Sequence, residues 1–353
     1  HGKHCSMKLA FVVNRIETEQ ADYTTIRLAR KAAARGHELA FFGLADFIYE
    51  SSGRICAMAS VPEPGDYADD AAYLDHLQND APEKRIVVED YDIVMLRSDP
   101  ADELTTRPWA PPSSLLFAQL AAAHGTIVLN DPSHLTDAQN KTYFQHFPEE
   151  VRPATCITRH ADEVSAFLEE HDGKGVLKPL QGSGGQGVFI VDKKNRQNLN
   201  QIIESITRDG YAIVQEYLPA AAEGDLRVIT LNGRPLQVDG TFASLRRSST
   251  TEDHRSNLSA GGKADLEQPD EAAMRAAEMC APKLIDDGMY LAGLDIVGDR
   301  MIEVNVDSPG ALSYMEDLSG VDFSGAIIDD LERKVRLKKN YSGTLSNRHL
   351  AVV

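Results

Sequence analysis

Apolar runs and helical stripes alternate along the first part of the chain. Residues 8–14, KLAFVVN, are an apolar run closed by a polar residue, which is typical of a buried strand. Apolar side chains then recur at helical spacing between Ile26 and Ala33, and Gly36 ends the predicted helix. The apolar run ELAFFG at 38–43 is the next strand. This strand–helix–strand order predicts a parallel sheet.

The same pattern continues to a first domain boundary. Residues 91–100 predict a strand that ends in a polar cluster, 113–124 a helix, and 126–130 a strand before Asp-Pro. Residues 51–90 are rich in Asp, Pro and Ala, so we expect an irregular, mostly exposed excursion. No GxGxxG follows the first strand, so a dinucleotide-binding fold is not supported.

The pattern changes after residue 132. Helices are predicted over 160–173, 198–210, 270–287 and 324–337, and strands over 175–180, 187–191, 211–218, 225–244 and 292–306. Asn232-Gly233, between two apolar runs, is a strong hairpin signal. A polar loop over 245–265 is long enough to indicate a function. We therefore expect an α/β protein: a β-α-β parallel-sheet domain over 7–132, two α+β units over 133–218 and 219–320, and a helical tail over 321–353.

Composition limits the classes of partner. The 353 residues carry 42% hydrophobic side chains and a net charge of −18, typical of a globular chain of two or three domains that repels nucleic acid and anionic membranes. No apolar run reaches membrane-spanning length, no signal peptide is visible, and four scattered cysteines indicate a reducing cytoplasm. We expect the opening HGKHCS to be a leftover tag before Met7.

Acidic and amide side chains gather in the strand pair over 292–306. A hairpin loop at 298–300 would place Asp295 opposite Glu303, and Asn305 would share the face of Glu303. Such hard oxygen donors suit Mg²⁺, which takes its remaining ligands from phosphate and water. The alternative is a half-solvated antiparallel face, where alternating polar residues are routine.

A glycine-rich stretch, KPLQGSGGQGVF at 178–189, follows a strand that ends in Lys178. It is not a Walker A loop, because the lysine precedes the glycines. Its N–H groups could close over phosphates, or it could be a flexible turn. Lys141, at the start of a predicted helix, is a second candidate cation.

An apolar strand ends at a proline in QEYLP, 215–219, which is a plausible hinge between domains. Asp225 and Arg227 share a strand face, and four residues of the polar loop lie near one another in sequence: Arg246, Arg247, Arg255 and Asn257. Arginines bind carboxylate or phosphate bidentately, although a solvated loop explains any one of them.

The order of these features resembles that of the ATP-grasp ligases and, more closely, the prokaryotic glutathione synthetases. The similar stretches are MLRSDP, LNDPSHLTDAQNK, LKPLQGSGGQGVF, GDLRV, RSNLSAGG and GLDIVGDRMIEVNV, within residues 7 to 315. The resemblance implies two ATP-grasp subdomains that clasp a nucleotide behind an N-terminal substrate domain.

The resemblance also implies roles for individual residues. For ATP it implies Lys141, Lys178, Gly182, Ser183, Gly184, Gly185, Glu216, Tyr217, Leu218 and Asp225. For Mg²⁺ or Mn²⁺ it implies Asp295, Glu303 and Asn305, and for catalysis Lys178, Arg227 and Arg246. For the substrates it implies Arg97, Asp99, Arg255, Asn257, Gly261, Gly262, Asp307 and Ser308.

The implied reaction joins a small-molecule acid to an amine in the cytoplasm, in a homodimer or homotetramer. ATP converts a carboxylate, most simply that of γ-glutamylcysteine, into an acyl phosphate that glycine then attacks. After EVNV, however, the family reads Thr-Ser-Pro-Thr where this chain has Asp307-Ser-Pro-Gly310. A ligase with another acid or amine is therefore an alternative, and a non-catalytic ATP-binding regulatory protein is another.

Overall fold

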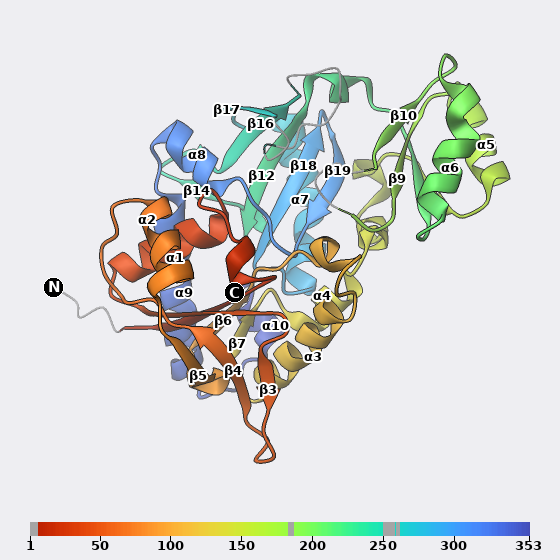
Figure 1. The fold of residues 1–353 in the computed structure, drawn as a ribbon. Helices are drawn as coiled ribbons and strands as arrows, with labels where there is room; N and C mark the ends of the chain where they lie inside the picture. Colours follow the sequence, from red (N-terminus) through yellow and green to blue (C-terminus); the bar gives the residue numbers. More distant parts are fainter. Residues whose placement is uncertain (1–5, 183–186, 250–257, 259–261) are drawn as a thin grey trace.

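The computed structural model describes residues 6–182, 187–249, 258 and 262–353, and these form three main sheets (Figure 1). None of the described helices is long and apolar enough to cross a bilayer. The boundaries that we propose at residues 132, 218 and 320 separate three stretches that contribute mainly to one sheet each from a helical tail.

The first sheet has a parallel centre, as predicted. Its parallel strands are β1 (Lys8–Val13), β2 (Glu38–Gly43), β6 (Ile93–Leu96) and β7 (Ile127–Leu129). Phe11 packs in one apolar cluster with Ile26 of α1 (Thr24–Ala34), while its neighbour Val12 packs in another with Ala118 of α3 (Ala110–Ala123). Since successive strand residues point to opposite faces, the two helices cover opposite faces of the sheet.

The prediction that residues 51–90 form an irregular, mostly exposed excursion is wrong about the irregularity, although about half of these residues are exposed. The region between β2 and β6 contains β3 (Phe47–Tyr49), β4 (Ile55–Ser60), α2 (Asp70–Asp75), a π-helical turn (His76–Asp80) and β5 (Glu83–Val87). β4 pairs antiparallel with β2, β3 and β5, and Cys56 and Ala57 are fully buried. Small side chains in β4 lowered its apparent hydrophobicity, and the Asp and Pro residues lie mainly in the connections.

The strand order creates a crevice at one end of the first sheet. The chain leaves β1 for β2 on one side and later returns to place β6 on the other side. With crossover helices on opposite faces, the segments that follow β1 and β6 diverge, and open α/β sheets bind ligands at such a point. Asn14 follows β1 and Arg97 follows β6, so both lie at this crevice.

The second sheet is antiparallel and carries its own small core. Its strands, in spatial order, are β10 (Phe189–Val191), β9 (Gly175–Pro179), β11 (Ala212–Glu216) and β8 (Thr155–Thr158). Helices α5 (Ala161–Glu170) and α6 (Leu199–Thr207) pack on it at the right of Figure 1. The predicted glycine-rich connection joins β9 to β10, so Lys178 lies next to it.

The third sheet is also antiparallel. Its strands, in spatial order, are β17 (Lys263–Asp265), β16 (Ser244–Ser248), β12 (Asp225–Leu231), β18 (Leu291–Val297) and β19 (Arg300–Asn305), and α7 (Glu271–Asp286) packs on it. The predicted hairpin at Asn232-Gly233 is confirmed: both residues have positive φ and join β12 to β13 (Arg234–Pro235). A short hairpin follows, β14 (Gln237–Val238) with β15 (Thr241–Phe242).

The hairpin of β18 and β19 differs from the prediction at its turn. Val297 pairs with Arg300, so the turn has two residues rather than three. A bulge between Asp295 and Ile296 then shifts the register by one residue. Asp295 therefore still pairs with Glu303, as predicted, because the two deviations compensate.

The last segment of the chain holds the first and third sheets together. It contains α8 (Leu312–Ser319), α9 (Phe323–Asn340) and α10 (Asn347–Leu350), and the predicted helix over 324–337 is confirmed. On the first-sheet side, Arg35 pairs with Asp329 of α9 at 2.7 Å. On the third-sheet side, buried Lys334 donates to Asn232 Oδ1 at 2.8 Å.

A buried asparagine makes a second connection between these sheets. Asn130, after β7 and before α4 (Pro132–Asp137), donates to the carbonyls of Leu291 and Val306 at 2.9 and 2.6 Å and accepts from Leu291 N–H. It thereby fixes the carboxyl end of the first sheet against β18 and the segment that follows β19.

Candidate functional site

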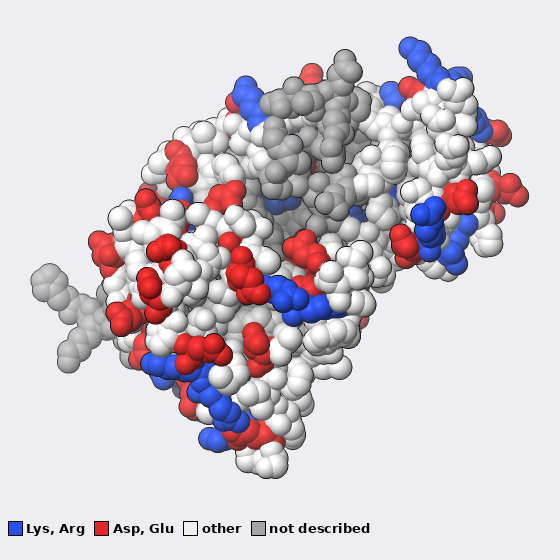
Figure 2. Space-filling view, viewed as in Figure 1, with Lys and Arg blue, Asp and Glu red and all other residues white. Residues whose placement is uncertain are grey.

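The three sheets converge on a hollow surface, visible near the centre of the face in Figure 2. Its main cavity has a volume of about 800 Å³ and is lined from the crevice of the first sheet, from β9 and β11, and from β12, β18 and β19. A smaller adjoining cavity of about 130 Å³ lies beside Lys141 and Asp307. Acidic side chains are scattered over the first-sheet part of the same face, and the lining of the main cavity combines several lysines and arginines with a larger number of carboxylates.

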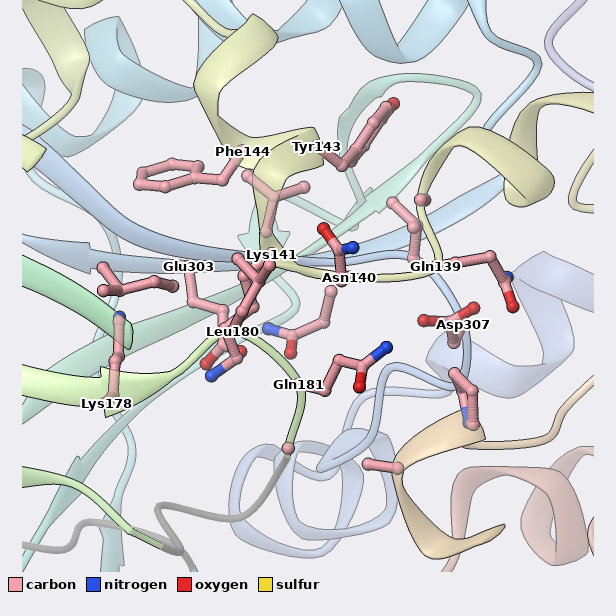
Figure 3. Close-up of a pocket in the computed structure, with 18 of the residues that line it drawn as sticks. Gln139, Asn140, Lys141, Tyr143, Phe144, Lys178, Leu180, Gln181, Glu303 and Asp307 are labelled. Carbon is pink, nitrogen blue, oxygen red and sulfur yellow. The ribbon is translucent and has the colours of Figure 1, made fainter. Parts of the chain in front are cut away.

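Two lysines and a glutamate meet where the cavities join (Figure 3). Lys141 Nζ lies 3.3 Å from Glu303 Oε1. Burial and then the charge of Lys141 lower the pKa of Lys178 to about 8, although Glu303 and Asp295 limit the shift. The structure thus brings together both predicted lysines and one predicted metal ligand.

The charged centre of the site is a carboxylate held by two arginines. Asp295 is 2% exposed and accepts from Arg227 Nε at 2.5 Å and Nη2 at 3.1 Å. Arg247 Nη2 lies 3.0 Å from the same carboxylate. Burial alone would raise the pKa of Asp295, but the two arginines lower it to about 2. Asp295 is therefore ionised at any physiological pH.

The cavity contains Arg247 where the prediction had its neighbour Arg246. Arg246 points away from the cavities and pairs with Glu267 at 2.7 Å, while Arg247 lines the main cavity and also pairs with Asp225 at 2.5 Å. Adjacent strand residues face opposite sides, so a shift of one residue exchanges the two arginines. Arg247 is the partner of Asp225 in the β12–β16 ladder, and a sequence-based pairing of these two opposite charges could have identified it.

The predicted metal ligands form a set that fits a hard cation. Asn305 donates its amide N–H groups to Gly293 O at 3.1 Å and Asp295 Oδ2 at 3.2 Å, which leaves its oxygen for the cavity. Burial raises the pKa of Glu303, but the charges of Lys141, Lys178 and Arg227 together outweigh burial, so the pKa is lowered overall. No three His, Cys, Asp or Glu side chains in the described parts form a metal-binding group. Two carboxylates and an amide suit Mg²⁺, provided that phosphate and water complete its shell.

The predicted hinge lines the opposite wall of the main cavity. Glu216, Tyr217 and Leu218 lie there beside apolar side chains of β9, β10 and β19: Val176, Ile190 and Ile302. Glu216 is tied to Arg300 by an ion pair, and Lys174 Nζ lies 3.8 Å from the centre of the Tyr217 ring. A flat apolar group bound here would contact these apolar side chains on both of its faces. The backbone groups at the strand ends would lie beside it.

Several predicted residues fall at the edge of what the structure describes. Gly182 lines the smaller cavity, and Gly262, just before β17, lines neither. The others lie outside the described residues: Ser183, Gly184, Gly185, Arg255, Asn257 and Gly261.

The first sheet supplies the remaining predicted residues. Arg97 is 5% exposed and donates to Thr25 Oγ1 at 3.0 Å and to Pro309 O at 2.8 Å. Asp99 and Ser308 line both cavities, and Asp307 lines the smaller one. Burial, and then the charge of Asp99, raises the pKa of Asp307 well above its usual value.

Comparison with protein families matches nearly the whole chain. Residues 7–136 match the N-terminal domain of prokaryotic glutathione synthetase, and residues 140–320 match its ATP-grasp domain. The chain is 34% identical to the glutathione synthetase of Vibrio parahaemolyticus over 72% of this chain and 77% of that protein. It is 30% identical to that of Gloeobacter violaceus over 94% of this chain and 98% of that protein.

Solved structures of low sequence identity share the fold. D-cycloserine synthetase DcsG has a TM-score of 0.57 at 16% identity and covers 92% of this chain and 99% of its own. Macrocyclase MdnC from Microcystis aeruginosa has a TM-score of 0.58 at 14% identity, with coverage of 92% and 99%. The fold and the family matches agree: the chain belongs to the prokaryotic glutathione synthetase family of ATP-grasp ligases.

Proposed function

We propose that this protein is an ATP-dependent carboxylate–amine ligase that forms an amide through an acyl phosphate, with γ-glutamylcysteine and glycine as its substrates. The observation that carries the proposal is the cluster of Arg227, Arg247 and Asp295 on the wall of a cavity that also contains Lys141 and Lys178. Phosphoryl transfer to a carboxylate develops negative charge on several oxygens, and fixed cations stabilise that charge.

The lining of the cavity supports one orientation of ATP. The apolar walls beside the hinge at 216–218 suit the adenine ring, and Lys141 and Lys178 suit the phosphates. Glu303, Asn305 and Asp295 would hold Mg²⁺, which neutralises phosphate charge when bound. A solved structure with this fold, the ATP-grasp ligase PsnB at a TM-score of 0.52, is a complex with Mg and ADP.

Different residues of the chain would then serve different parts of the reaction. Arg227 is held by both oxygens of Asp295, so its guanidinium keeps one orientation and reaches the segment after β19 through Gly310 O at 3.3 Å. Arg247, fixed by Asp225 and Asp295, presents a second positive charge on the same wall. The predicted glycine-rich segment after Gly182 would cover the phosphates and exclude water from the acyl phosphate.

The experiment is an ADP assay with product detection by mass spectrometry. With ATP and Mg²⁺, ADP should form rapidly only when γ-glutamylcysteine and glycine are both present, with one amide product for each ADP. ADP formation that ignores both compounds, or binding of ATP without any turnover in a panel of acids and amines, would contradict the proposal. We expect the active protein to be a cytoplasmic homo-oligomer, as the family resemblance implies.

A second candidate, a ligase for another amine, is favoured by Asp307. This carboxylate replaces the threonine expected from the family pattern, and the described residues offer it no ion pair or hydrogen bond. It would disfavour an acceptor that brings its own carboxylate close and favour one with a cationic or donor group. Equimolar glycine and larger or cationic amines should therefore compete differently in wild type and in Asp307→Thr. Use of glycine alone by both proteins would exclude this candidate.

A further inference from the structure

The crevice of the first sheet contains a buried carboxylate that the proposed ATP chemistry does not use. Glu19 follows the short 3-10 helix Ile16–Thr18, is 6% exposed and lines the main cavity. Its Oε1 is fully buried, and no donor in the described residues reaches it. A buried oxygen without a donor is costly, because it has lost its hydration without compensation. A ligand that donates a hydrogen bond to this oxygen would therefore gain the full free energy of that bond, because it would displace no donor among the described residues.

The surroundings of Glu19 favour a cationic donor. Besides Glu19, Asp99 and Asp102 line the same part of the cavity, and Asp99 already accepts from Ala101 N–H. Burial raises the pKa of Glu19 to about 7, the charge of Arg97 opposes this rise, and the charge of Asp102 adds to it. A protonated amine placed here would restore the ionised form of Glu19 and offset the excess of negative charge.

An anion-binding group lies next to this carboxylate. Two nitrogens of the buried Arg97 guanidinium are occupied by Thr25 Oγ1 and Pro309 O, and the third, Nη1, makes no hydrogen bond to the described residues. Helix α1 also begins at the cavity, with Thr24 and Thr25 in the lining, and its N-cap Tyr23 makes no side-chain capping bond. An uncapped N-terminus beside an arginine favours a carboxylate.

This crevice is connected to the reacting end of the cavity by one short segment. Arg97 Nη2 donates to Pro309 O at 2.8 Å, and Arg227 Nη1 donates to the next carbonyl, Gly310 O, at 3.3 Å. The two arginines therefore contact consecutive residues of the same segment. A substrate anchored at Arg97 can extend past this segment toward Arg227.

We propose that this crevice binds the α-amino-acid head group of the acid substrate, with its ammonium on Glu19 and its carboxylate on Arg97 and the N-terminus of α1. The distal carboxylate of the same molecule then lies toward Arg227, where it is activated. This inference rests on the proposed function, and it names a specificity contact, Glu19, that the motifs did not include.

Binding of two matched probes tests the inference without turnover. Isothermal titration would compare γ-glutamylcysteine with glutarylcysteine, which lacks only the α-amino group. Wild type should bind glutarylcysteine at least about tenfold more weakly, as expected for the loss of a charge-assisted hydrogen bond. In Glu19→Gln the affinity for γ-glutamylcysteine should fall by about that factor, and the two probes should bind within threefold of each other.

Glu17→Gln is the matched control, because Glu17 is two residues away, has a side chain that is 72% exposed and lies outside both cavity linings. It should keep the discrimination of wild type, and thermal unfolding would confirm that both variants fold. Equal binding of the probes by wild type, no binding of γ-glutamylcysteine, or unchanged discrimination in Glu19→Gln would each overturn the inference.

The ADP assay separates this inference from the proposed function. A protein that ligates γ-glutamylcysteine but binds both probes equally would keep the function and lose the head-group site. A protein that discriminates through Glu19 but forms no amide would keep the site and lose the function.

Discussion

Arg246 and Arg247 are adjacent in sequence but have different surroundings, and this difference gives a test at the residue scale. Arg247 is fixed by Asp225 and Asp295 inside the cavity, whereas Arg246 pairs with Glu267 outside it. Arg247→Ala should lower kcat/KM by at least about a hundredfold, the loss typical of a fixed transition-state donor. Arg246→Ala should change it by less than about threefold. Steady-state kinetics with both variants would contradict the assignment if Arg246→Ala were the more damaging.

Glu19 predicts a pH dependence of stability. Its pKa rises from 4.5 to about 7 on folding, so the native state holds the proton more tightly. The free energy of unfolding should therefore be highest below pH 4.5 and fall as the pH rises to about 7, by up to roughly 3 kcal/mol from this group. Arg97 and Asp102 face Glu19, and Asp102, whose pKa is raised to about 6 by burial and then by Asp99 and Glu103, contributes with the same sign.

Glu19→Gln should flatten this dependence and stabilise the protein above pH 7, because no charge is then buried. Urea unfolding from pH 4.5 to 8 provides the measurement, with Glu17→Gln as control. Equal slopes in wild type and Glu19→Gln would show that Glu19 does not titrate as the structure predicts.

Residue types at fixed spacing predicted which candidate metal ligands lie together. Alternation along 303–305 and the hairpin pattern predicted that Asp295, Glu303 and Asn305 share one face of the strand pair, and the structure brings the three to one cavity. Arg247 was named with the polar loop, but the catalytic role was given to Arg246, because the face that each arginine occupies depends on the pairing register with β12. Glu19 was missed because its burial comes from residues distant in sequence, such as Arg97, and no local pattern indicates it.

At the element scale, the start of β12 depends on a glycine. Gly224 has a φ of +91°, and a Cβ there would lie 1.9 Å from Arg247 O of β16. Gly224→Ala should therefore force β12 and β16 apart, lower the free energy of unfolding by more than about 2 kcal/mol and displace Arg247.

Gly298 is the control, since its φ is +64° and a Cβ there would meet nothing within 4 Å. Gly298→Ala should cost only about 1 kcal/mol and leave activity unchanged. Urea unfolding and ADP release measure both effects, and equal losses in the two variants would contradict the close approach of β12 and β16.

Elements with long periodic patterns were predicted well, and short ones were not. The first β-α-β unit, the Asn232-Gly233 hairpin and the helix over 324–337 appear as expected. The strands in 51–90 were missed because β4 consists largely of small residues, and its place in the sheet is decided by pairing with β3 and β5. The turn at 298–299 was predicted one residue too long, because the bulge beside Asp295 has no sequence signal.

At the scale of the whole molecule, the site exists only where separate sheets meet. Asn130 fixes the first sheet to Leu291 and to the segment after β19, and Lys334 joins the tail to the β12–β13 turn. The division of the chain at residues 132, 218 and 320 stays a prediction, and the sequence did not indicate these contacts, because they depend on packing between distant segments. With a net charge of −18 on the chain and more acidic than basic side chains in the cavity lining, an anion is attracted only locally, beside the fixed lysines and arginines.

The central claim is that a carboxylate is activated by ATP in this cavity and then attacked by an amine. The most direct measurement uses γ-glutamylcysteine labelled with ¹⁸O in its distal carboxylate, together with ATP, Mg²⁺ and glycine. Mass spectrometry of the inorganic phosphate should show one ¹⁸O transferred for each amide formed, because the acyl phosphate gives its bridging oxygen to phosphate when the amine attacks. Amide formation with unlabelled phosphate, or labelled substrate that yields neither amide nor ADP, would contradict the account.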